Sequence, residues 1–513
     1  MACFVAAHGL LDQFSVFQSA KTHMTSTATA IINCVITAEF LRELAAVVGC
    51  ARLLDSKDEL LVYECDGYVV EKSVPDVVVF PENADEVVAI VRACEKHNVP
   101  FVPRGAGTSL AGGCLPVGGG VMIALTKMRQ IVDINLRDRY AVVEPGVVNV
   151  NLTRALAGTG FHYAPDPSSQ GACTIGGNVA TNSGGPHTLK YGVTVNHVIG
   201  VEFVSPQGEL IQIGGPCGRG NGFDLSGLFV GSEGTFGVVT KVWVRITRNP
   251  AAYRTMLAIF DSVDDTTQAI SNIIGAGIVP AALEMMDRGI VGALEEAFHF
   301  GFPLDAEAVL LIEVDGLEVA VDAEAETITT LCKDSGAREV RLSQTEEERA
   351  LLWKCRKQAF GAIGRLSPSY CTQDGVVPRT KVPEILRFIA EVSERHNIRI
   401  VNVFHAGDGN LHPILLFDER NAEQVKRVML ASDEILGKCI DLGGSVTGEH
   451  GIGVEKISFM NRLFTDIDLA VMEDVRKAFN PDGRCSPGKL LPTAGACGME
   501  YIEKNHPGRK AAM

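Results

Sequence analysis

Three glycine-rich segments, at residues 104–113, 165–185 and 227–240, constrain the fold of this chain most strongly. The first follows a short predicted strand at residues 100–103, the second is rich in Ser, Thr and Asn, and the third leads into another Val-rich strand. Segments of such low bulk let the backbone approach a ligand closely. Three of them within about 140 residues are hard to explain as turns alone, so together they predict a binding site.

The first segment matches neither of the common phosphate-binding motifs. The third glycine of a G-x-G-x-x-G fingerprint would fall on Leu110, and Gly113 stands where a Walker loop requires lysine. The N–H groups of a glycine-rich turn can still bind a pyrophosphate. This segment alone fits a structural turn as well as a ligand loop, and the other two segments favour the ligand.

A second feature is the run from His405 to His412, followed by Gly448-Glu449-His450-Gly451. Asp408-Gly409 is typical of a two-residue hairpin turn, and that register would place His405 directly opposite His412, with Cβ atoms roughly 5 Å apart. Glu449 would then complete a three-ligand metal site whose open position suits catalysis. The alternative is a tight turn flanked by ordinary histidines.

Composition restricts the partners of the chain. Net charge is −16, from 62 acidic and 46 basic residues without a Lys/Arg cluster, which argues against nucleic acid and anionic membranes. The 14 cysteines are scattered without a C-x-x-C pair, which predicts a reduced, cytoplasmic protein that does not ligate an iron–sulfur cluster. No targeting signal or apolar span is convincing, and Met24 is an alternative start.

The motifs together resemble a known family. Residues 104–109, 175–185 and 231–234 resemble the FAD-binding domain of the vanillyl-alcohol oxidase superfamily. Residues 405–412, 448–453 and 480–489 resemble its branch of D-2-hydroxyacid dehydrogenases, and the run from Tyr370 to Arg379 favours the flavin subunits of bacterial glycolate oxidases within that branch. The similarity extends from about Asp55 to Leu491.

The resemblance implies an α+β fold with a PCMH-type FAD-binding domain of two α/β subdomains. A C-terminal FAD-linked oxidase domain, with an antiparallel sheet and helices, would cap the flavin. The expected boundaries are an extension at 1–30, a helical lead-in at 31–73, the FAD-binding domain at 74–250, the C-terminal domain at 251–491 and a tail at 492–513. Patterning predicts a strand at 76–81 and helices at 84–97 and 421–442.

The resemblance also implies the cofactor contacts. Covalent members of the superfamily carry histidine where this chain has Thr108, so FAD is expected to be held non-covalently. The expected FAD-binding residues are Arg104, Gly105, Ala106, Gly107, Thr108, Ser109, Gly112, Pro165, Ser169, Ile175, Gly176, Gly177, Ala180, Thr181, Asn182, Gly184, Glu233, Gly234, Gly237, Val238 and Asn480.

The implied chemistry is oxidation of a small 2-hydroxyacid to its 2-oxoacid. His405, His412 and Glu449 would bind Zn²⁺ or a similar divalent metal, and His450 would take the hydroxyl proton while hydride passes to flavin N5. The alternative for His450 is a structural support for Glu449. Arg356 and Arg379 are candidates for the substrate carboxylate.

Substrate and partners follow from the same resemblance. Relatives that oxidise 2-hydroxyglutarate have polar contacts where this chain has Phe360, Thr372 and Ile414, so glycolate or D-lactate is expected. Expected partners are an iron–sulfur subunit and a second flavin subunit of a glycolate oxidase complex, which would bring the chain to the periphery of the inner membrane. The rival hypotheses are a stand-alone D-lactate dehydrogenase and a flavin-free metallohydrolase.

Overall fold

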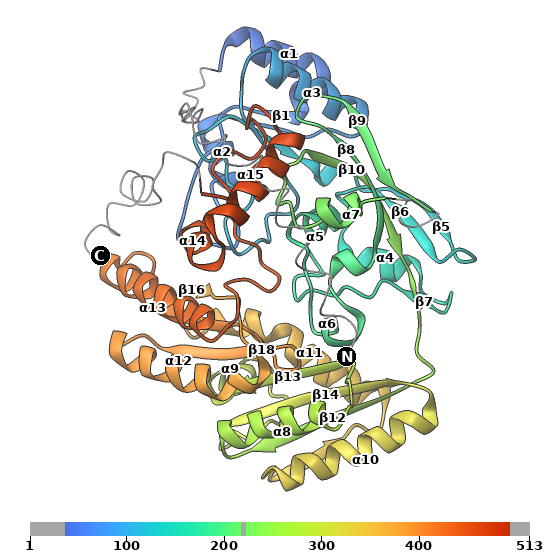
Figure 1. The fold of residues 1–513 in the computed structure, drawn as a ribbon, viewed down its shortest axis with the longest axis vertical. Coiled ribbons are helices and arrows are strands. Elements are labelled where there is room, and N and C mark those ends of the chain that lie inside the picture. The colour runs from blue at the N-terminus through green and yellow to red at the C-terminus, as the bar shows by residue number, and fades with distance from the viewer. Residues whose placement is uncertain (1–35, 217–221, 493–513) are drawn as a thin grey trace, which may run out of the picture.

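The computed structural model describes residues 36–216 and 222–492 and shows three mixed layers of helices and sheet (Figure 1). The expected extension at 1–30, with Met24, and all but the first residue of the tail lie outside the described residues. Within the described ranges, no helix is both long and apolar enough to cross a membrane.

The first layer is a four-stranded sheet in the order β1-β2-β4-β3, in which β2 and β3 each pair with β4 in parallel. Its elements are α1 (Ala38–Val48), β1 (Leu53–Leu54), α2 (Lys57–Leu60), β2 (Val77–Val79), α3 (Ala84–Lys96), β3 (Phe101–Arg104) and β4 (Val121–Ala124). Thr37 caps α1, which buries Phe40, Leu44 and Val48 at a spacing of four and is a helix of the predicted lead-in. The lead-in also contains β1, which pairs with β2.

The second layer is a five-stranded sheet in the order β5-β6-β10-β8-β9, and every strand pair in it is antiparallel. The elements of this part of the chain are β5 (Ile131–Asn135), β6 (Tyr140–Val143), α4 (Asn149–Ala155), β7 (Phe161–His162), α5 (Ile175–Thr181), α6 (Thr188–Tyr191), β8 (Val198–Val204), β9 (Leu210–Gly214), α7 (Leu225–Phe229), β10 (Val238–Arg245) and β11 (Thr247–Arg248). Of these, β7 and β11 pair with each other in a separate two-stranded sheet. The second subdomain is therefore α+β rather than α/β, while the α+β class of the whole chain is confirmed.

The third layer is a nine-stranded antiparallel sheet with helices on its faces, in the lower half of Figure 1. Its elements are β12 (Ala252–Phe260), α8 (Val263–Gly275), β13 (Ala282–Asp287), α9 (Arg288–Phe298), β14 (Ala308–Gly316), α10 (Glu318–Asp334), β15 (Glu339–Leu342), α11 (Glu346–Ile363), β16 (Ser369–Thr372), β17 (Gly375–Val376), α12 (Val382–His396), β18 (Ile400–His405), β19 (Asn410–Leu411), β20 (Pro413–Phe417) and α13 (Ala422–Asp441). The predicted helix at 421–442 is confirmed as α13, with Asn421 as its cap.

The C-terminal segment passes α13, against which α14 (Met460–Leu463) packs, and then returns to the first two layers, where α15 (Asp466–Phe479) lies against the N-terminal half (Figure 1). Phe479 stacks on Phe236 with ring centroids 4.3 Å apart, and Cys485 forms a parallel bridge with Phe101 beside β3. Residues near the two ends of the described chain thus share one core.

Candidate active site

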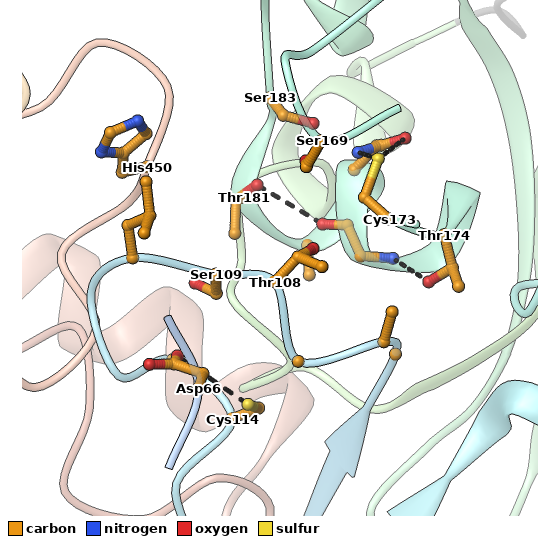
Figure 2. Close-up of a pocket in the computed structure, with 18 of the residues that line it drawn as sticks. Asp66, Thr108, Ser109, Cys114, Ser169, Cys173, Thr174, Thr181, Ser183 and His450 are labelled. Atoms are coloured by element: carbon orange, nitrogen blue, oxygen red, sulfur yellow. Dashed lines mark hydrogen bonds between the residues drawn. The ribbon is translucent and has the colours of Figure 1, made fainter. Parts of the chain in front are cut away.

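A cavity of about 620 Å³ is lined by all three glycine-rich segments and also by His412, Glu449 and His450. Figure 2 shows Thr108, Ser109, Ser169, Thr181 and His450 around this space. The expected cofactor residues that line it are Arg104, Gly105, Ala106, Gly107, Thr108, Ser109, Ser169, Gly176, Gly177, Ala180, Thr181, Glu233, Gly234 and Gly237. The fold thus brings together two sets of residues that are far apart in the sequence.

The remaining expected cofactor residues lie outside the lining: Gly112, Pro165, Ile175, Asn182, Gly184, Val238 and Asn480. Several of them support the site structurally. The N–H of Gly184 donates to Glu449 Oε2 at 3.0 Å, and the Asn480 side chain donates to the Cys485 carbonyl at 2.9 Å. Ile175 and Val238 are fully buried in apolar cores.

Close packing explains the glycines of the first segment. A Cβ at Gly105 would lie 2.5 Å from Thr174 Oγ1, and a Cβ at Gly107, where φ is +71°, would overlap the Arg104 guanidinium. Arg104 Nη2 donates to the Cys65 carbonyl at 2.9 Å, which holds the guanidinium beneath the loop. The loop is therefore packed against neighbouring protein groups and disfavours a side chain at these two positions.

Glu233 connects the third glycine-rich segment to the loop that follows His450. Its carboxylate accepts hydrogen bonds from the N–H groups of Ile452 and Gly453, both at 2.7 Å, and its φ is +51°. Burial raises the pKa of this carboxyl, and the two N–H groups oppose that effect. Glu233 thus lines the cavity while fixing the path of residues 451–453.

The predicted hairpin register is wrong, but the side chains of His405 and His412 still lie close together. His405 pairs with Asn410 across a four-residue turn, so His412 lies two residues further along the same face as a diagonal neighbour. The two imidazole centroids are 5.1 Å apart. Asp408-Gly409 ends the turn instead of forming its centre. Gly409 has φ +79°, and an added Cβ there would collide with the Val377 carbonyl oxygen.

His405, His412 and Glu449 converge as the sequence predicts. The Nε2 atoms of both histidines lie 3.1 Å from Glu449 Oε1. One possible ligand atom from each of the three residues lies within 4.8 Å of the other two. Burial opposes ionisation of both His405 and Glu449, yet the carboxylates of Glu284 and Glu449 raise the pKa of His405, and His405 and His412 lower the pKa of Glu449. Two imidazoles and a carboxylate in a buried cluster fit a divalent ion.

Asp374 organises the loop that carries Glu449 and His450. Its Oδ2 accepts hydrogen bonds from the Thr447 hydroxyl at 2.6 Å and from the N–H groups of Gly448, Glu449 and His450 at 2.8–3.0 Å. Burial alone would raise the pKa of Asp374, but its electrostatic interactions with His450, Lys456 and His412 outweigh burial and lower the pKa to about 2. The carboxylate therefore stays ionised and holds four groups in place.

His450 stacks on His412, with ring centroids 5.0 Å apart and planes 10° from parallel. Burial lowers the pKa of His450 to about 4, despite the opposing charge of Asp374. Its Nδ1 is buried and has no hydrogen-bond partner in the described part of the chain. A neutral imidazole that lines the cavity can accept a proton.

The two candidate arginines are placed differently from each other, and neither lines the cavity. Arg356 is fully buried and its Nε donates to Glu284 Oε2 at 2.6 Å, leaving Nη1 and Nη2 without partners among the described residues. Arg379 is exposed and donates to the Gly407 carbonyl at 3.2 Å. Lys357, adjacent to Arg356 on α11, does line the cavity and lies 3.5 Å from Asp166.

Sequence reasoning missed three buried acids of this region: Asp66, Glu284 and Asp374. Glu284 interrupts the apolar run Ala281–Met286, and a lone acid in a buried strand is a signal that the pattern contained. Asp66 lines the cavity, and burial raises its pKa to about 6. Its position gave no comparable signal.

The comparisons with known proteins agree with this geometry. The model of an FAD binding domain matches residues 75–214, and that of FAD linked oxidases, C-terminal domain, matches residues 249–490. The chain is 44% identical over 88% of its length to glycolate oxidase subunit GlcD of Escherichia coli (strain K12), covering 92% of that protein. It is 40% identical to GlcD of Bacillus subtilis (strain 168), over 89% of the chain and 97% of the relative. A D-lactate dehydrogenase of Anaerostipes hadrus is 30% identical, over 84% of this chain and 91% of that relative.

Solved structures show the same fold at low sequence identity. p-Cresol methylhydroxylase with substrate bound aligns with a TM-score of 0.76 at 17% identity, over 88% of this chain and 96% of that one. A 4-ethylphenol oxidase from Gulosibacter chungangensis aligns with a TM-score of 0.74 at 19% identity, over 89% of this chain and 98% of that one. The chain therefore belongs to the family of FAD-linked oxidases that includes the glycolate oxidase subunit GlcD.

Proposed function

We propose that this protein is an FAD-dependent oxidoreductase that converts a small D-2-hydroxyacid, glycolate or D-lactate, into its 2-oxoacid. One observation carries the proposal: His412 and Glu449, two members of the His405–His412–Glu449 cluster, line the same cavity as the glycine-rich segments of the FAD-binding domain. The names of the relatives, glycolate oxidase subunit and D-lactate dehydrogenase, support the substrate class.

The residues of the cavity can divide the work as follows. Residues 104–109 and 176–181 would hold FAD without a covalent bond, because Thr108 offers no ring nitrogen to the flavin. His405, His412 and Glu449 would hold a divalent ion. When bound, the flavin supplies a two-electron acceptor and the ion a Lewis acid for the substrate oxygens.

His450 would accept the proton of the substrate hydroxyl. It lines the cavity next to Glu449, its neutral form prevails because its pKa is about 4, and its Nδ1 has no partner among the described residues. Lys357 is a cation at the cavity wall and would attract the substrate carboxylate. Arg356 could add to that attraction through its two unpaired Nη groups if substrate binding opened a path to them.

The residues that the C-terminal domain contributes to the cavity favour a small substrate. Phe360 and Tyr370 line it, so a second carboxylate would meet little polar compensation there. We further propose that the chain works with an iron–sulfur subunit and a second flavin subunit, because the named relatives are subunits of glycolate oxidase. A stand-alone D-lactate dehydrogenase is the second candidate, supported by the relative of that name.

The experiment is anaerobic mixing of the purified protein with glycolate and both enantiomers of lactate while flavin absorbance is followed. Bleaching by glycolate or D-lactate, and its absence with L-lactate, is the expected result. Acid precipitation should release all the yellow chromophore into the supernatant. A protein without flavin, or a flavin that none of these acids reduces, would refute the proposal.

A further inference from the structure

Glu284 is a fully buried carboxylate that contacts both His405, a predicted metal ligand, and the fully buried Arg356. Its Oε1 lies 2.8 Å from His405 Nδ1, and its Oε2 accepts from Arg356 Nε at 2.6 Å. We propose that Glu284 is a positioning residue for His405, with Arg356 as its counter-ion. This inference rests on the proposed function, because it assigns Glu284 a role toward the metal of that site.

Strand pairing fixes the contact between Glu284 and His405. β13 and β18 are antiparallel, and Glu284 is the direct cross-strand partner of His405 in their register. Directly opposed residues project from the same face of a sheet with their Cβ atoms close together. The carboxylate is therefore part of the sheet that carries the histidine and needs no mobile loop to reach it.

The contact determines which nitrogen of His405 is available. A carboxylate accepts a hydrogen bond, so the Nδ1 beside Glu284 carries a hydrogen, and Nε2 is the nitrogen left to bind a metal ion when the imidazole is neutral. Nε2 is the atom that lies 3.1 Å from Glu449 Oε1 within the donor group. Hydrogen bonding of this kind orients a metal-binding histidine and raises its basicity.

Arg356 compensates the charge that this arrangement buries. A second pair on the same helix shows the pattern: Arg349, seven residues earlier on α11, makes two 2.8 Å hydrogen bonds to the buried Glu313 of β14. Glu313 also accepts from the Trp353 indole and touches none of the three predicted ligands. Two arginine–glutamate pairs thus stand on one helix, and the Arg356–Glu284 pair, which is the fully buried one, contacts the predicted metal site.

The second pair supplies a matched control. The FAD-loaded wild type, Glu284→Gln and Glu313→Gln are titrated with Co²⁺ against a competing chelator, and the visible absorption of bound Co²⁺ is recorded. Glu284→Gln should weaken Co²⁺ binding by about 10–100-fold and shift its spectrum, because His405 loses its charged partner. Glu313→Gln should bind Co²⁺ as the wild type does, although both variants lose stability.

A double variant keeps the test decisive if an unpaired Arg356 prevents folding. Glu284→Leu/Arg356→Leu removes both charges together and leaves His405 without an acceptor, so it should weaken Co²⁺ binding at least as much as Glu284→Gln. Wild-type affinity and spectrum in the Glu284 variants would overturn the inference. A wild type that binds no Co²⁺ would instead refute the proposed metal site itself, and the inference with it.

Discussion

Glu449 and His450 are neighbours in the chain, but their side chains have different surroundings. The Glu449 carboxylate contacts both histidines of the cluster and the N–H of Gly184. The His450 imidazole stacks on His412 and keeps Nδ1 unpaired among the described groups. Both backbone N–H groups are held by Asp374. One anchoring residue can therefore fix a predicted ligand and a predicted base at once.

Substitution of the two neighbours should separate metal binding from proton transfer. Glu449→Gln should lower metal content, because a neutral amide is a poorer donor to a divalent ion. His450→Ala should retain the metal and slow anaerobic flavin reduction by roughly 10²–10⁴-fold, the usual contribution of a positioned base. Elemental analysis and stopped-flow absorbance measure the two effects. If His450→Ala lost the metal and Glu449→Gln kept it, the assigned roles would be reversed.

Gly107→Val should yield folded protein that lacks FAD. The residue has φ +71° and an added side chain would collide with the Arg104 guanidinium, so the loop at 104–109 could not keep its shape. Gly171→Val is the matched control, since Gly171 has no positive φ and nothing within 4 Å of an added Cβ. Flavin absorbance per protein measures occupancy. Full occupancy in Gly107→Val would show that the loop does not bind the cofactor.

At the scale of elements, the sequence predicted what is local and missed what depends on distant pairing. The strand at 76–81 and the helices at 84–97 and 421–442 are confirmed, because apolar spacing and capping residues such as Asn421 are local signals. The hairpin register failed because β13 and β17 fix the positions of β18 and β19 from outside. Glu284 was missed because 121 residues separate it from His405.

The return of the C-terminal segment should stabilise the cavity wall. Phe479 stacks on Phe236 and also contacts Phe229, which lines the cavity. Phe479→Ala should reduce the free energy of unfolding by about 2 kcal/mol and lower FAD affinity, since a half-buried aromatic contact is lost. Phe223→Ala, at a side chain that is 96% exposed, is the control and should change neither quantity. Thermal unfolding and flavin titration measure both, and an unchanged FAD affinity would contradict the link.

At the scale of the whole molecule, a half-buried charge network joins the FAD-binding half to the C-terminal sheet. His187, just before α6, lies 3.0 Å from Asp166 Oδ2 and 3.6 Å from Glu313 Oε1 on β14. Arg349 and Lys357 contact the same two acids from α11. Because the cavity lies between these halves, their relative position determines its shape.

Stability should therefore depend on the charge of His187. Burial opposes that charge, but Asp166 and Glu313 outweigh it and raise the pKa of His187 from 6.5 to about 10. A raised pKa in the folded state contributes stability that is fully present below pH 6.5 and is lost as the pH rises toward 10. Both acids have lowered pKa values, so they stay charged throughout this window.

The comparison with His187→Gln tests this dependence. The difference in free energy of unfolding between wild type and variant, from urea titrations, should be largest at pH 6.5 and shrink toward pH 10. His197→Gln is the control, because burial lowers the pKa of His197 to about 4 and its charge does not change within the window. The difference for His197→Gln should be constant with pH. A difference for His187→Gln that is equally constant would mean that His187 is neutral and that the two halves are held together by other contacts.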